Sequence, residues 1–408
     1  MILTVSSRRY RDRRTSASSR FGYHSRVPER KEACDIVIIG GGAIGTSTLY
    51  QLSKSGANVA LLEEFDLNTQ ASGRNAGSLH GQIQYEPFEE LGIEWAKTFL
   101  HGLGILADSL AIWKTLSAEL EVDLEVSSNG GLMIAENDQN MRHLEKKVEL
   151  ENSIGIASRM LSAAELQELA PYISKKMVGG SISPIEGKAN PLLLAPAFAE
   201  AAKRNGGKVF TNRKVTAIVR DGARYRIETT NGHFTAAKVV ICANAGIPAL
   251  GQGIGVKIPI DDAPVQVSVT EQVEKFVHHL VYFTSEKLTF KQANSGSLLI
   301  GGGWPARYNP DGDPILNPDS LRRNLRVALK VVPKIADIRV IRTWIGVGNG
   351  TPDHNPIIDE IASMPGVYVG MYPYMGFTAS PLMGRLISEL VLTGRTERDI
   401  SPFALSRF

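Results

Sequence analysis

The chain has 408 residues, of which 43% are hydrophobic and 21% are charged, with 39 glycines and 20 prolines. These values are ordinary for a globular protein of two to three domains, or of one large domain with a companion, and they exclude collagen-like, coiled-coil and largely disordered chains. Two cysteines exclude a disulfide framework and a cysteine-based metal site, and no run of about 18 apolar residues is present to span a membrane as a helix. We therefore expect a soluble protein from a reducing compartment, without a metal.

The first 32 residues differ in composition from the rest. They carry nine basic and three acidic side chains, a local charge of +6 within a formal net charge of +3, so the remaining chain is slightly acidic. The basic balance therefore gives no support for a nucleic-acid partner. Richness in Arg and Ser fits an organelle transit peptide, and a disordered extension or a mistranslated upstream start stays open. We expect residues 1–32 to lie outside the fold, and the protein to be cytoplasmic, or mitochondrial if this leader is a transit peptide.

A dinucleotide-binding pattern begins after the leader. The apolar stretch 35–39 predicts a buried parallel strand, and the turn 40–45 matches G-x-G-x-x-G. A helical pattern over 46–55 and a second buried strand over 59–62 follow, ending at Glu63. The glycines permit a tight turn, a close approach to the pyrophosphate and close helix–strand packing, while Glu63 would bind the ribose hydroxyls. The pattern predicts a dinucleotide and leaves FAD and NAD open.

Later motifs separate FAD from NAD. They are Ser72-Gly73-Arg74-Asn75-Ala76-Gly77, Val215 within 214–218, the strand and turn 239–246, Trp344-Ile345-Gly346 with Thr351-Pro352-Asp353, and Met375-Gly376-Phe377-Thr378. In this order they resemble the D-amino-acid oxidase and glycine/sarcosine oxidase superfamily of FAD-dependent amine oxidoreductases over residues 35–400. The similarity is greatest to the branch of opine oxidase, D-hydroxyproline dehydrogenase and the sarcosine oxidase β-subunit.

The resemblance implies noncovalent FAD and a set of cofactor-binding residues. We expect these to be Gly40, Gly42, Ala43, Ile44, Gly45, Glu63, Glu64, Ser72, Arg74, Asn75, Gly77, Val215, Gly346, Gly376, Phe377 and Thr378. Ser380 and Pro381 suit the N-cap and first turn of a terminal helix with an apolar stripe over 382–391. In the family this helix end lies at the pyrimidine edge of the flavin, where its dipole would stabilise the negative charge of the reduced ring.

The implied fold class is α/β with two domains. A discontinuous, Rossmann-like FAD-binding domain is expected from residues 33–83, 159–247 and 338–408, and an α+β antiparallel-sheet substrate domain from 84–158 and 248–337. Periodicity predicts helices over 89–100, 104–119 and 320–331, and strands over 131–135, 265–269 and 298–300. A small-ligand site is expected in the cleft between the two domains.

The resemblance implies oxidation of a C–N bond: a hydride moves from the α-carbon of an amine or amino acid to flavin N5, and the resulting imine hydrolyses. A substrate carboxylate usually calls for a bidentate arginine, yet Gly348 stands where glycine oxidase-like members carry one. This departure favours the branch whose members belong to hetero-oligomers, so partner subunits for electron transfer are expected. A flavin-binding subunit with a relay or structural role is the alternative, and the flavin-side motifs oppose an NAD-linked dehydrogenase.

Three side chains are candidates for the chemistry: His80, Lys291 and Tyr374. His80, Gln82 and Gln84 alternate after the flavin loop, and an extended chain would point them to one side of the pocket. The alternatives are an ordinary surface strand for this row, a solvated lysine for Lys291, and core packing for Tyr374 and its neighbour Tyr372.

Overall fold

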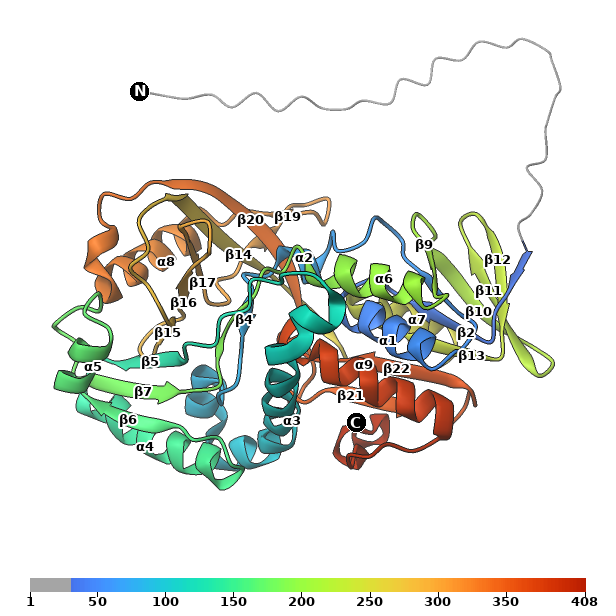
Figure 1. The fold of residues 1–408 in the computed structure, drawn as a ribbon, viewed down its shortest axis with the longest axis horizontal. Helices are drawn as coiled ribbons and strands as arrows, with labels where there is room; N and C mark the ends of the chain where they lie inside the picture. Colours follow the sequence, from blue (N-terminus) through green and yellow to red (C-terminus); the bar gives the residue numbers. More distant parts are fainter. Residues whose placement is uncertain (1–30) are drawn as a thin grey trace, which may run out of the picture.

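A six-stranded, mostly parallel sheet organises one half of the molecule in the computed structural model, which describes residues 31–408 (Figure 1). Only the edge strand β21 runs antiparallel to its neighbour. In spatial order the strands are β21 (Ile357–Glu360), β22 (Val367–Met371), β13 (Lys238–Ile241), β2 (Ile36–Ile39), β3 (Val59–Leu62) and β9 (Lys208–Phe210). Strands such as β2 are apolar throughout because both faces of the sheet are covered.

Helices cover one face of this sheet and a second sheet covers the other. Three helices, α1 (Ala43–Lys54), α6 (Leu194–Arg204) and α9 (Gly376–Thr393), share a core with alternate residues of β2 and β3. On the opposite face lie α7 (Ile247–Gly253) and a four-stranded sheet of β1 (Lys31–Ala33), β12 (Gly232–Ala236), β11 (Arg224–Thr229) and β10 (Val215–Asp221). The predicted α/β, Rossmann-like arrangement is confirmed.

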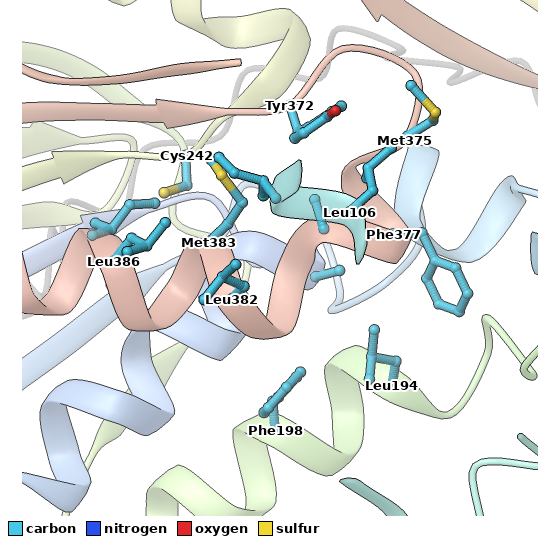
Figure 2. Packing of buried hydrophobic residues seen from close by; sticks show 14 of the residues in the cluster. Leu106, Leu194, Phe198, Cys242, Tyr372, Met375, Phe377, Leu382, Met383 and Leu386 are labelled. Carbon is cyan, nitrogen blue, oxygen red and sulfur yellow. The ribbon is translucent and has the colours of Figure 1, made fainter. Parts of the chain in front are cut away.

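Helix α9 is buried on two sides. Figure 2 shows Met383 and Leu386 on the side of the helix toward Cys242 of the sheet region, and Leu382 toward Phe198 of α6. Its expected start was wrong: α9 begins at Gly376, and Pro381 lies inside the helix. Proline cannot donate to the carbonyl of Phe377, four residues earlier, but the hydroxyl of Ser380 donates to that oxygen at 2.9 Å. The helix therefore continues through the proline.

An eight-stranded sheet organises the other half. All neighbouring strands are antiparallel except β5 and β15, which run parallel. Their spatial order is β20 (Val340–Gly350), β14 (Asp261–Gln272), β17 (Ser297–Gly301), β16 (Thr289–Gln292), β15 (Leu280–Phe283), β5 (Gly131–Ala135), β7 (Gly179–Ser183) and β6 (Arg159–Ser162). One face packs against α5 (Ala163–Leu169) and α8 (Pro318–Val331).

Strand pairing departs from the expected domain boundaries. Residues 159–183 and 340–350 were expected in the FAD-binding domain, but they supply β6, β7 and β20 to the eight-stranded sheet. The pairs are long-range, since β20 lies along β14 and β7 along β5, so no local pattern could reveal them. At the N-terminus, 31–32 belong to β1 and thus to the fold, while the rest of the expected leader lies outside the described residues.

The remaining elements lie outside the two large sheets. Helix α3 (Tyr85–Leu120) replaces the two helices expected over 89–100 and 104–119, with a kink at Gly92, whose φ is +77°. The others are α2 (Ala71–Arg74), α4 (Asp138–Ser153), and the pairs β4 (Ser78–Leu79) with β8 (Gly187–Lys188) and β18 (Arg307–Tyr308) with β19 (Pro314–Ile315). Among residues 31–408, none of the helices combines the length and apolar character needed to cross a bilayer.

Candidate active site

The glycine turn before α1 forms a cradle that side chains would fill. Gly40 has a φ of +109°, and a Cβ there would lie 2.5 Å from the carbonyl oxygen of Cys242. A Cβ at Gly45 would lie 1.9 Å from the carbonyl oxygen of Gly40. Helix α1 has Gly42 at its N-cap, which offers no capping side chain of its own, and its first turn contains no acidic residue. Apart from the N–H of Ala43, which donates to Ser72, the first N–H groups and the dipole of α1 are thus available to an anion.

The acidic residue at the end of β3 is tied to this turn. One carboxylate oxygen of Glu63 accepts a hydrogen bond from the backbone N–H of Gly41 at 2.6 Å. The carbonyl of Glu63 accepts from the N–H of Arg213 at 2.8 Å, which brings the start of β10 and its first residue, Val215, to the same end of the site. Glu64 differs, because its side chain is exposed and pairs with Lys214 at 2.8 Å. Of the two acids, Glu63 is the one held against the glycine turn.

The expected flavin loop, residues 72–77, reaches from the glycine turn to β20. The hydroxyl of Ser72 accepts a hydrogen bond from the N–H of Ala43 at 2.9 Å. At the other end, the indole N–H of Trp344 donates to the carbonyl of Arg74 at 2.7 Å, and a Cβ on Gly346 would lie 3.4 Å from Arg74. Within the loop, the side chain of Asn75 accepts from the N–H of Gly77, whose φ is +73°. The motif is thus held on both sides by hydrogen bonds between a side chain and the main chain.

The N-terminus of α9 lies against the N-terminus of α1. A Cβ on Gly376 would lie 3.5 Å from Cδ1 of Ile44, so the two motifs, more than 300 positions apart, meet in space. Thr378 is fully buried, and its hydroxyl accepts from the N–H of His80 at 3.0 Å and donates to the carbonyl of Ser78 at 3.2 Å. Phe377 instead directs its ring into the core, 5.1 Å from that of Trp113. Only its backbone is left to face a ligand.

These observations fit an FAD molecule. The cradle of glycines and the free N–H groups of α1 suit a pyrophosphate, Glu63 suits a ribose, and the N-terminus of α9 is a second positive helix end nearby. No side chain of the described residues caps α9, and its first turn contains no acidic residue. When bound, FAD supplies the two-electron acceptor for oxidation of the substrate.

Lys291 is buried beside β4, so the alternative of a solvated lysine is wrong. Its side chain is 1% exposed, and its ammonium nitrogen lies 2.7 Å from the hydroxyl of Ser78. Burial, followed by the charge of Lys188, lowers the pKa of Lys291 to about 7. The group can therefore carry or release a proton near neutral pH. Ser78 also accepts a hydrogen bond from Thr378, which in turn contacts His80.

His80 follows β4 directly in the chain. Its Nδ1 lies 2.8 Å from the hydroxyl of Tyr282, on β15. Burial, followed by the charge of Lys291, lowers the pKa of His80 to about 3, so the imidazole is neutral under physiological conditions. His80, Lys291 and Thr378, predicted from three separate motifs, are thus brought together around β4.

The expectation that His80, Gln82 and Gln84 point to one side of the pocket is wrong. Gln82 is buried, where it donates to the carboxylate of Glu186 at 2.6 Å and accepts from the ammonium of Lys147 at 2.8 Å. Gln84 turns to the loop before α9, where its amide lies 3.6 Å from the sulfur of Met375. Of the three, His80 is the one that contacts Thr378. Sequence reasoning missed Glu186, Tyr282 and Lys147, because no motif marks them. Tyr282 and Glu186 reach His80 only through strand pairing, and Lys147 of α4 reaches Gln82.

Tyr374 lies over the strand β20. Its φ is +55°, its side chain is 49% exposed, and its N–H donates to the carbonyl of Asn349 at 3.0 Å. A Cβ on Gly348 would lie 3.3 Å from the ring of Tyr374, so this ring occupies the space beside the position where the family arginine was expected. Tyr372 is 2% exposed and part of the main core, which agrees with the alternative of core packing for that residue.

Comparisons with known proteins agree with this geometry. A sequence model of the family described as FAD dependent oxidoreductase (DAO) matches residues 35–390. The chain is 28% identical to the beta subunit of sarcosine oxidase from Arthrobacter sp, over 93% of this chain and 92% of that protein. It is 24% identical to an opine oxidase subunit from Rhizobium meliloti, over 92% and 97%. The crystal structure of L-proline dehydrogenase from P. horikoshii superposes with a TM-score of 0.83 at 23% identity, over 93% and 98%.

The fold and site therefore define a flavoprotein oxidoreductase. The chain belongs to the DAO family of FAD-dependent oxidoreductases, and its relatives include enzymes of amino acids and amines.

Proposed function

We propose that this protein oxidises the C–N bond of an amino acid, imino acid or secondary amine with noncovalently bound FAD, giving an imine that hydrolyses. The observation that carries the proposal is that the start of α9 contacts the glycine turn at Ile44 and also the strand β4, against which Lys291 is buried. A dinucleotide-binding turn alone would serve many enzymes. A second helix N-terminus and a buried lysine beside it favour a flavin ring with a reacting substrate.

The side chains around β4 suit an amine substrate. Loss of hydride from the α-carbon needs the nitrogen lone pair, so the amine must react in its neutral form. His80 is neutral and offers no positive charge to oppose the substrate. Lys291, whose pKa is about 7, is the cationic group that a substrate carboxylate would meet, since Gly348 provides no arginine. The N-terminus of α9 would stabilise negative charge on the reduced cofactor.

The kind of amine is proposed from the relatives. The names of the proteins that resemble this chain include sarcosine oxidase, opine oxidase and L-proline dehydrogenase, which favours secondary amines. Two of these relatives are named as subunits, so we also propose that partner subunits receive the electrons. The cofactor-binding residues are proposed as predicted, with Glu64 and Phe377 contributing only backbone atoms.

The test is anaerobic reduction of the purified protein. The proposal requires the absorption bands of an oxidised flavin, and their bleaching by at least one member of a panel of sarcosine, D- and L-proline, hydroxyproline, glycine, D-amino acids and opines. Repeating the panel in air separates an oxidase from a dehydrogenase. If the flavin is present and no amine in the panel reduces it, catalysis is refuted in favour of the alternative, a flavin-binding subunit with a relay or structural role.

A further inference from the structure

A chain of hydrogen bonds leads from the candidate site into the interior of the eight-stranded sheet. It runs from His80 to Tyr282 at 2.8 Å and from Tyr282 to the carboxylate of Glu186 at 3.1 Å. Glu186 lies in the turn between β7 and β8 and is fully buried. A Cβ at Gly131 would lie 1.7 Å from this carboxylate, so the group fits only because that position is glycine.

The direction of the hydrogen bonds at Glu186 follows from its other partners. One carboxylate oxygen accepts from the backbone N–H of Gly81 at 2.5 Å, and the other accepts from the amide of Gln82 at 2.6 Å. The orientation of the Gln82 amide is fixed in turn, because its oxygen accepts from the ammonium of Lys147 at 2.8 Å. Both oxygens of Glu186 are thus acceptors, and these donors stabilise its ionised form. Burial outweighs them and raises the pKa of Glu186 to about 7, so the carboxylate is mostly ionised at pH 8.

The hydroxyl of Tyr282 must therefore donate to Glu186. Burial and the Glu186 carboxylate raise the pKa of Tyr282 well above 10, so the phenol keeps its proton. Since that proton is directed to Glu186, the oxygen of Tyr282 is left as an acceptor toward His80. A neutral imidazole then satisfies the contact only by donating from Nδ1, and this places the lone pair on Nε2.

We propose that Glu186 and Tyr282 are positioning residues that hold His80 as its Nδ1–H tautomer, so that Nε2 accepts a hydrogen bond from the substrate amine. Among residues 31–408, the structure gives a protein partner to Nδ1 of His80 and none to Nε2. The inference rests on the proposed function and specifies the substrate further. A neutral amine that donates to Nε2 must carry an N–H, so primary and secondary amines fit and tertiary amines do not.

The tautomer is measured directly on the wild-type holoenzyme. In protein labelled with 15N-histidine at pH 8, and with the His80 signals assigned from H80Q, we expect a protonated Nδ1 and an unprotonated Nε2. A protonated Nε2 would overturn the proposal. This readout needs no turnover, so it stands even if no amine reduces the flavin, a result that would refute the proposed function instead.

The substrate consequence is tested with matched amines. The rate constants for anaerobic flavin reduction are compared for sarcosine with N,N-dimethylglycine and for L-proline with N-methyl-L-proline. We expect wild type to prefer the N–H member of each pair by at least about tenfold, since a buried acceptor without its donor is costly. Equal rates within both pairs would contradict the proposal.

A second tyrosine–histidine pair provides the control. Tyr172 contacts Nδ1 of His279 at 2.9 Å, in a buried position of the same half of the molecule. We expect Y282F to shift the His80 tautomer signals. It should also reduce the rate preference for N–H amines to about threefold or less, which corresponds to about 0.7 kcal/mol or less. Y172F should leave both unchanged. If Y172F and Y282F behave alike, the effect is structural and the positioning role is refuted.

Discussion

Lys291 gives the sharpest prediction for stability, because a buried lysine opposes folding in a pH-dependent way. Its side chain is 1% exposed and its pKa falls from 10.5 in the unfolded chain to about 7. At about 1.4 kcal/mol per pKa unit, the difference amounts to a penalty of about 5 kcal/mol at pH 7 and below. Between pH 7 and 10.5 the unfolded chain holds the proton and the folded chain does not, so stability rises with pH.

Substitution of Lys291 by methionine should remove this penalty. We expect K291M to be more stable than wild type at pH 7.5, and its advantage in the free energy of unfolding to shrink by about 2 kcal/mol at pH 9. Urea unfolding of the flavin-free chain at both pH values measures the difference. K257M is the control, since Lys257 is exposed and its removal should not change the pH dependence. If K291M exceeds wild type in the free energy of unfolding by the same amount at both pH values, the claim that buried Lys291 has a lowered pKa is refuted.

Two further predictions concern the cradle and the buried ion pair. G45V should weaken FAD binding by at least about tenfold, because the new Cβ would lie 1.9 Å from the carbonyl of Gly40. G253A is the control and should bind FAD as wild type does, because its new Cβ meets nothing within 4 Å. Flavin titration followed by fluorescence measures both affinities, and an unchanged affinity in G45V would contradict the assignment of this turn. Lys147 and Glu151 form a 2.6 Å ion pair with both side chains fully buried. K147M should therefore destabilise the protein by about 3–5 kcal/mol in thermal or urea unfolding. K147M/E151Q should recover most of the loss, because the uncharged amide still accepts from the N–H of Ile83 and the cost lies in an unpaired buried charge. A double variant no more stable than K147M would contradict this.

The sequence predicted local features of the fold well. The run of glycines at 40–45, the buried strands around it and the acid at its end form one short segment, so their pattern carried the Rossmann-like unit without tertiary information. Strand β5 was predicted with the bounds that the structure has. The domain boundaries failed because β6, β7 and β20 are assigned by distant pairing partners, which no local pattern records.

In the candidate site, too, the sequence predicted the residues near motifs and missed those that distant strand pairing brings in. Lys291, His80 and Thr378 each lie next to a motif, and the structure brings them together around β4. Glu186 and Tyr282 lie more than 100 positions from His80 in the sequence, and reach it only through the pairing of β4 with β8 and of β5 with β7 and β15. A buried carboxylate beside a glycine turn has no sequence pattern that distinguishes it from a surface acid.

The position of the cofactor tests the central claim most directly. A crystal structure of the FAD-loaded protein should show the pyrophosphate within hydrogen-bonding distance of the backbone of Gly42 or Ile44, and the flavin ring between the start of α9 and Lys291. A flavin located elsewhere on the chain, or a ring far from Thr378 and His80, would contradict the assignment of the site.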